Sequence, residues 1–174
     1  MTSEPGGAIR GRALLFGDHV NADVLHPSSF FSLDDDTVAS GFLGATSADR
    51  RQARRVDEPI VVVAGRNFGC GSSRETTVRA FQLAGVRAVV AESFGRLFLR
   101  NLLAIGLEGF ELTTRDTAPL ADGDLVEIDA ERTALTHLAT DTAWALRPRD
   151  PFLDAVSSAG GLLELLASRE IDPR

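Results

Sequence analysis

Two serines and an arginine follow three closely spaced glycines in the segment GRNFGCGSSRE, residues 65–75. Residues 60–63 before it are β-branched, and residues after it have helical spacing, which predicts a strand, a turn and a helix. Such a turn directs free N–H groups to one place, where the helix start adds partial positive charge. Ser72, Ser73 and Arg74 therefore predict a site that holds a carboxylate and acts on the carbon beside it.

Three other interpretations of this segment are weaker. The turn could be purely architectural, with Ser72 as a helix N-cap, but two serines and an arginine in one turn favour function. It is not a P-loop, because Gly-Lys-Ser/Thr is absent and the chain contains no lysine. It is a poor dinucleotide fingerprint, because Arg74 occupies the position of the third glycine.

Composition excludes several classes of function. The chain has 174 residues, which suits a single domain over 1–174, and its net charge of −7 argues against a nucleic-acid partner. Its one cysteine excludes an internal disulfide and an iron–sulfur cluster held by this chain alone, and it suits a reducing cytoplasm. No apolar run approaches the length of a membrane span, and residues 1–9 are predicted to be a frayed tail without the apolar core of a signal peptide.

The pattern of apolar residues predicts an α/β fold with a parallel sheet core and a small antiparallel addition. We expect a βαβα core over 60–106 that carries the candidate site. Its last helix, 94–105, is apolar around much of its circumference and is expected to be largely buried. Strands are predicted at 10–16, 60–64, 88–91, 125–129, 135–138 and 143–146, and helices at 36–42, 48–56, 73–83, 94–105 and from 151 to 166 with a break at 160–161.

Three blocks of the chain resemble the small subunits of the 3-isopropylmalate dehydratases, which belong to the aconitase family. They are GDHVNAD at 17–23, GRNFGCGSSRE at 65–75 and AESFGRLFLRN at 91–101. Their order and spacing agree over nearly the whole chain. The resemblance implies the swivelling β/β/α domain of aconitase-like enzymes. It also implies the isomerisation of 2-isopropylmalate to 3-isopropylmalate by dehydration and rehydration, as in leucine biosynthesis.

The resemblance further implies that a separate large subunit carries a [4Fe–4S] cluster, and that this chain binds no metal and is active only in that complex. By position, Ser72 would be the base, and Ser73, Arg74 and the backbone of Gly71 would bind a small dicarboxylate substrate. Asp23, Asn67 and Cys70 would support the site, with Cys70 as a packing residue beside it. Self-association of the isolated chain stays open.

Residues 28–57 correspond to the segment that shapes specificity in this family. No arginine occurs between Arg12 and Arg50, so this segment offers no extra clamp for a tricarboxylate. Phe30 and Phe31 could instead form an apolar wall, which favours an alkyl side chain on the substrate, although both could equally be core residues.

The chain departs from the family pattern at several positions. Thr76 stands where a histidine is usual, Asn21 and Ala22 replace an acid and a hydroxyl residue, and His19 replaces an amide. We expect the histidines, including His26 and His137, to be polar surface residues. Other hypotheses therefore remain: a related small subunit acting on another alkylmalate or on homoaconitate, a non-catalytic anion-binding module, and, weakest, a nucleotide-binding domain.

Overall fold

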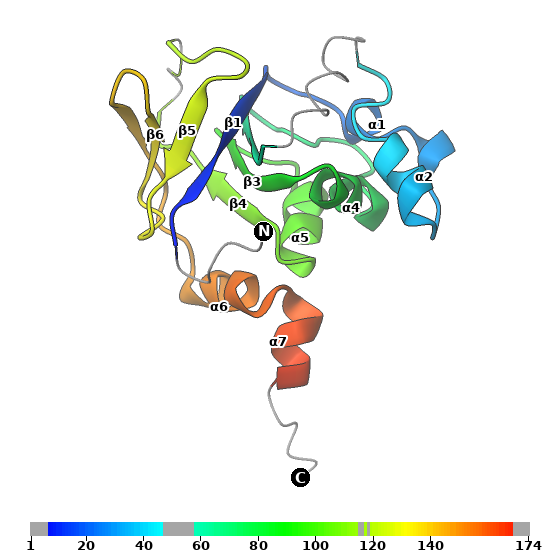
Figure 1. Ribbon diagram of the computed structural model, residues 1–174. Helices are drawn as coiled ribbons and strands as arrows, with labels where there is room; N and C mark the ends of the chain where they lie inside the picture. The colour runs from blue at the N-terminus through cyan, green and yellow to red at the C-terminus, as the bar shows by residue number, and fades with distance from the viewer. Residues whose placement is uncertain (1–6, 47–57, 115–116, 118, 169–174) are drawn as a thin grey trace.

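A single mixed sheet organises the computed structural model, which describes residues 7–46, 58–114, 117 and 119–168. Within these residues the sheet has seven strands in the order β4-β3-β2-β1-β5-β6-β7 (Figure 1). The strands are β1 (Ile9–Phe16), β2 (Ile60–Ala64), β3 (Val86–Ala91), β4 (Glu108–Glu111), β5 (Leu125–Ile128), β6 (Ala134–His137) and β7 (Thr142–Ala145).

Four of these strands, β1 to β4, run parallel to one another. Every residue of β2 is buried, as expected for a β-branched strand covered on both faces. Parallel strands bring their carboxyl ends to one edge of the sheet. The loops that follow β1, β2 and β3 therefore meet at that edge.

The remaining strands form the predicted antiparallel addition. β5 pairs antiparallel with β1, and β6 and β7 continue the meander. Side chains of β2 point alternately to two cores. Val61 and Val63 share one core with Leu135 and Trp144 of the antiparallel strands, whereas Val62 shares the other with side chains of the helices. The layers are thus antiparallel strands, parallel strands and helices, which confirms the predicted β/β/α architecture.

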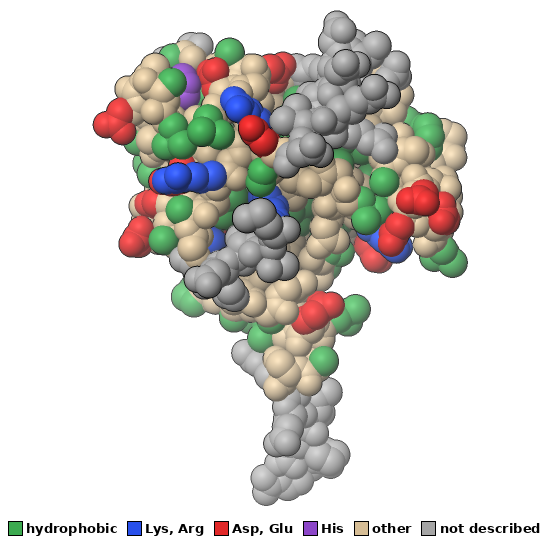
Figure 2. All heavy atoms as spheres, viewed as in Figure 1, with side chains coloured by type: hydrophobic (Ala, Val, Ile, Leu, Met, Phe, Trp, Pro, Cys, Tyr) green, Lys and Arg blue, Asp and Glu red, His purple; other side chains and the backbone are tan. Residues whose placement is uncertain are grey.

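Helices cover one face of the parallel strands, where α4 packs against both α2 and α5 (Figure 1). Asp34 caps α2 through a hydrogen bond from the Thr37 N–H, and Figure 2 shows acidic side chains gathered over this helix. The helices are α1 (Ala22–Leu25), η1 (Ser28–Phe30), α2 (Asp35–Ser40), α4 (Glu75–Leu83), α5 (Arg96–Ala104), α6 (Pro151–Ala159) and α7 (Leu162–Ser168). None of the helices in the described ranges is long and apolar enough to cross a membrane.

Most predicted elements are present with ends shifted by at most two residues, but the burial predicted for one helix was wrong. The helix expected at 94–105 forms as α5, yet only Phe98 and Leu102 of it are buried, and Leu97 is 51% exposed. Only one face of α5 is fully covered, so Leu99 and Leu103 are partly buried and Leu97 is exposed. Strand β4 and helix α1 were not predicted, and the helix expected at 48–56 lies outside the described residues.

Candidate active site

The candidate site lies at the carboxyl ends of β1 and β2, where two loops run side by side. The His19 N–H donates to the Arg66 carbonyl oxygen at 2.7 Å, and the Gly69 N–H donates to the Val20 oxygen at 2.9 Å. The Ala22 N–H donates to the Cys70 oxygen at 2.8 Å. The first and second blocks of the sequence pattern, separated by more than forty residues, thus form one backbone-linked unit.

Two glycines give the turn its shape. Gly69 and Gly71 have φ angles of +70° and +89°, a region that side chains disfavour. A Cβ atom on Gly69 would overlap the Phe98 ring, and one on Gly71 would lie 2.9 Å from Asn21 Nδ2. The turn therefore fits closely between α5 and the loop after β1.

The two serines of the turn have different environments. Ser72 is exposed, whereas Ser73 is only 9% exposed. The Asn101 side-chain amide lies 3.3 Å from the Ser73 carbonyl oxygen and 3.4 Å from its hydroxyl oxygen. The turn thus presents one hydroxyl outward and ties the next one to α5.

Helix α4 begins at Glu75, two residues later than predicted. Arg74 is its N-cap residue, with extended backbone, and no side chain caps the first turn. The alternative interpretation of Ser72 as the N-cap is therefore wrong. The N–H groups of this first turn, which carry partial positive charge, lie directly after the serines.

Arg74 lies over an aromatic ring contributed by the segment before α2. Its Cζ atom is 5.1 Å from the centre of the Phe31 ring. The Arg74 side chain is exposed, and among the described residues it makes no ion pair. Its charge is thus available for an anionic ligand.

Phe30 points elsewhere. A Cβ atom on Gly41 would overlap the Phe30 Cβ atom, so Phe30 packs on the turn that ends α2. The structure therefore brings Phe31 to Arg74 and directs Phe30 toward the 41–44 turn. Residues 47–57 of the predicted specificity segment lie outside the described residues.

Two of the predicted supporting residues, Asn67 and Cys70, lie in the loop after β2, and the third, Asp23, lies in α1. The Asn67 N–H donates to the Ser93 hydroxyl oxygen at 2.9 Å, and the Asn67 amide nitrogen lies 3.2 Å from His19 Nδ1. Cys70 is partly buried, with its Sγ atom 3.5 Å from the His19 carbonyl oxygen, so it packs beside the turn. Asp23 is exposed in the first turn of α1.

An ion pair braces the loop after β1. The backbone N–H of Arg66 donates to Asp18 Oδ1 at 2.8 Å, and its guanidinium lies 2.7 Å from Oδ2. These hydrogen bonds lower the pKa of the Asp18 carboxyl below its usual value, and the backbone hydrogen bond has the largest effect. The carboxylate stays ionised and holds the first two blocks together.

The expected surface position of two histidines was wrong. His26 is fully buried, its Nε2 lies 3.1 Å from the Val38 carbonyl oxygen, and burial lowers its pKa. His137 is 5% exposed, and its Nε2 lies 3.4 Å from Asp124 Oδ2. Each ring finds a polar partner inside the fold, which offsets part of the cost of its burial.

Sequence reasoning assigned no role to Asn21 or Asn101. Asn21 caps α1, accepting the Asp23 N–H, while its amide group lies against Gly71. Asn101 holds Ser73. Both occur inside the matching blocks, but their contacts cross between elements that spacing along the chain does not relate.

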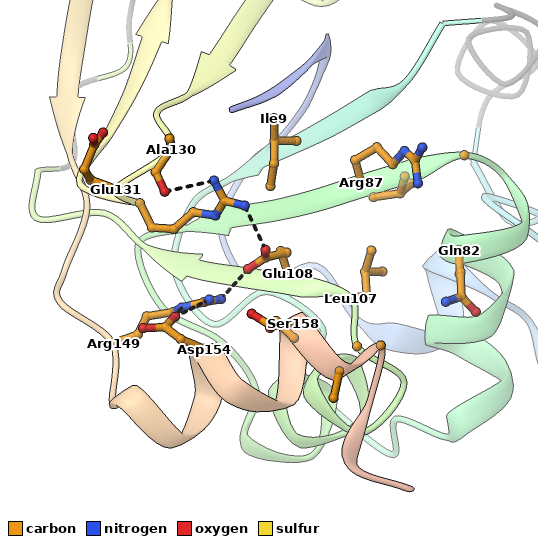
Figure 3. A pocket seen from close by; sticks show the side chains of 17 residues that line it. Ile9, Gln82, Arg87, Leu107, Glu108, Ala130, Glu131, Arg149, Asp154 and Ser158 are labelled. Atoms are coloured by element: carbon orange, nitrogen blue, oxygen red, sulfur yellow. Dashed lines mark hydrogen bonds and ion pairs between the residues drawn. The ribbon is translucent and has the colours of Figure 1, made fainter. Parts of the chain in front are cut away.

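A cavity of about 590 Å³ lies at the opposite edge of the sheet, near the starts of β3 and β4 (Figure 3). Four of its charged side chains form a linked set: Glu108 contacts both Arg132 and Arg149, and Arg149 also contacts Asp154. None of the predicted site residues lines it. In the part of the chain that the structure describes, no group of three or more His, Cys, Asp or Glu residues could hold a metal ion.

Comparison with known proteins shows to which family this chain belongs. Residues 40–114 match the model of the aconitase C-terminal domain. The 3-isopropylmalate dehydratase small subunit of Moorella thermoacetica is 37% identical over 161 residues, which cover 92% of this chain and 96% of that protein. This chain belongs to the aconitase family. The family members with which it aligns over nearly its whole length are named as small subunits.

Two further members of the aconitase family are similar. The methanogen homoaconitase small subunit of Methanothermobacter thermautotrophicus is 38% identical, over 90% of this chain and 89% of that protein. The crystal structure of a 3-isopropylmalate dehydratase from Methanocaldococcus jannaschii has a TM-score of 0.84 at 34% identity, over 94% of this chain and 96% of that one.

Proposed function

We propose that this chain is the small subunit of a heteromeric hydro-lyase that isomerises 2-isopropylmalate to 3-isopropylmalate in leucine biosynthesis. The observation that carries the proposal is the glycine turn, which sets an exposed serine two residues before an arginine at the start of a helix, and this arginine makes no ion pair with any residue that the structure describes. The alignment with dehydratase small subunits over 92% of the chain supports it.

In this proposal Ser72 removes the proton from the substrate carbon. A serine hydroxyl is a weak base unless its alkoxide is stabilised. The uncapped first turn of α4 and the Arg74 guanidinium provide positive potential beside it. Ser72 is exposed, so it can reach a substrate held between this chain and a partner.

Arg74, Ser73 and the Gly71 backbone bind a substrate carboxylate in this proposal. A guanidinium can hold a carboxylate through two parallel hydrogen bonds, which orients the neighbouring carbon. Because Asn101 fixes Ser73, the clamp is attached to α5. A bound and oriented dicarboxylate would bring its acidic C–H bond to Ser72.

The cofactor is proposed to belong to a large subunit. With one cysteine in the chain and no metal-ligand cluster among the described residues, this chain does not fit a [4Fe–4S] cluster. Held by the large subunit, such a cluster would supply a Lewis acid for the substrate hydroxyl. We further propose a cytoplasmic location, which suits a biosynthetic enzyme with one free thiol.

A second candidate is the same chemistry on homoaconitate, because a methanogen homoaconitase small subunit is as similar to this chain as the dehydratase subunits are. The absence of arginine between Arg12 and Arg50 disfavours a tricarboxylate. The aromatic ring of Phe31 beside Arg74 supports a substrate with an alkyl group.

The test is co-expression with the large subunit under anaerobic conditions, followed by an ultraviolet assay for the unsaturated intermediate from 2-isopropylmalate, citramalate and homocitrate. We expect activity on 2-isopropylmalate that requires both chains and iron. Ser72→Ala should lower the rate by at least about a hundredfold. Ser158→Ala, an exposed serine beside the cavity at the opposite edge, is the control and should leave it unchanged. Activity of this chain alone, or full activity of Ser72→Ala, would refute the proposal.

A further inference from the structure

The contact between Arg74 and Phe31 extends to a second ring, that of His26. Phe31 contacts both the Arg74 guanidinium, whose Cζ atom is 5.1 Å from the ring centre, and the His26 imidazole, whose centre is 5.5 Å away and which is stacked at an interplanar angle of 23°. We infer that Phe31 is a positioning residue, which holds the Arg74 guanidinium ready for the substrate carboxylate. This inference rests on the proposed function for the role of Arg74.

Without the Phe31 ring, the Arg74 side chain would have considerable conformational freedom. It is exposed, and no ion pair within the described residues holds it. An arginine without a partner samples many rotamers, and ordering it on ligand binding weakens the affinity. A ring under the guanidinium restricts that motion in advance. A cation–π contact uses the face of the guanidinium, so its N–H groups stay available for a carboxylate.

The ring can restrict Arg74 because it is itself held. The Phe31 N–H donates to the Ser28 carbonyl oxygen at 3.1 Å. His26, which stacks on this ring, is fully buried, and its Nε2 lies 3.1 Å from the Val38 oxygen in α2. The stack therefore connects a carbonyl group of α2 to the clamp at the start of α4.

The neighbouring aromatic residue provides a matched control. Phe30 also lies beside His26, with ring centres 6.3 Å apart and tilted by 47°, but it packs on the 41–44 turn. Replacing Phe30 removes an aromatic ring from the same segment and leaves the face under Arg74 in place.

The contact is tested first by NMR on the full, isolated chain. The Cδ methylene protons of Arg74, assigned by their loss in Arg74→Gln, should show an upfield ring-current shift. We expect that shift to disappear in Phe31→Leu and to persist in Phe30→Leu and Phe31→Trp. An Arg74 signal that is the same in wild type and Phe31→Leu would overturn the inference, whatever the enzyme assay shows.

The role of the contact is tested in the complex with the large subunit. Phe31→Leu should raise KM for the alkylmalate about two- to fivefold while kcat changes less, since a preformed clamp stabilises substrate and transition state alike. Phe31→Trp should restore the wild-type KM, and Phe30→Leu should keep it. An unchanged KM in Phe31→Leu, with the NMR shift lost, would show that the stack is only structural. An inactive wild-type complex would count against the proposed function, and the NMR comparison would still decide whether the ring holds Arg74.

Discussion

Replacing Gly71 by alanine tests whether the shape of the turn positions Ser72, the proposed base. Gly71 has a φ angle of +89°, and its added Cβ atom would lie 2.9 Å from Asn21 Nδ2 and 3.0 Å from Asn21 Oδ1. Asn21 cannot simply turn away, because its Oδ1 atom accepts the Asp23 N–H at the start of α1. Either the turn or the N-cap of α1 must therefore move. Because Ser72 directly follows Gly71, we expect its hydroxyl to be displaced.

The expected magnitude has two parts. A side chain in the left-handed region costs about 1–2 kcal/mol. For a chain of this size that cost lowers Tm by roughly 2–8 °C. The contact with Asn21 adds to this backbone strain. A displacement of the reactive group by about 1 Å can lower the rate about a hundredfold.

Gly123→Ala is the matched control. Gly123 has a φ angle of +90°, and its added Cβ atom would meet nothing within 4 Å. Both variants therefore carry the same backbone strain, and only Gly71→Ala carries the collision beside Ser72. Thermal denaturation of each isolated chain and turnover by each reconstituted complex should separate the two effects. The reasoning is wrong if Gly71→Ala loses no more stability than Gly123→Ala and keeps wild-type turnover.

Two further variants test the residues that hold the loops. Asp18→Asn should lower Tm at pH 7 by weakening the ion pair with Arg66. Because the folded pKa of Asp18 is lowered, this stabilisation is present above the unfolded value of about 3.9 and is lost as pH falls through the folded pKa. The Tm difference should therefore shrink toward pH 3, and a constant difference would contradict the assignment. Asn101→Leu removes the donor beside the buried Ser73, so we expect a loss of about 1–3 kcal/mol in urea denaturation together with lower turnover. Unchanged stability would show that water replaces the amide.

The parallel core could be predicted from the sequence because its signals are local. A β-branched run, a glycine turn and a helical repeat follow one another between residues 60 and 83, and each restricts the backbone by its own chemistry. The acids Asp34, Asp35 and Asp36 lie at the start of α2, where acidic side chains favour a helix N-terminus, so this signal is local as well. Strand β4 was missed because Glu108–Glu111 is short and carries an acid at each end, so only its pairing with β3 makes it a strand.

Burial was harder to predict, because it depends on which face of an element meets the rest of the fold. The leucines of α5 suggested a buried helix, yet Leu97 is exposed. His26 suggested the surface, yet α2 covers it and supplies its hydrogen-bond partner. Neither outcome can be derived from composition, because both depend on packing partners that lie elsewhere in the chain.

The sequence by itself determined the type of chemistry. Two hydroxyls and a guanidinium after a glycine turn indicate an anion site whatever the rest of the fold is. The reason is that a glycine and a helix start affect the residues next to them in the chain. Only the tertiary structure decided which groups are brought to that site. It turns Ser72 outward, ties Ser73 to Asn101 and places Phe31 under Arg74. These contacts join residues from different elements, so they depend on how the helices and loops pack around the sheet.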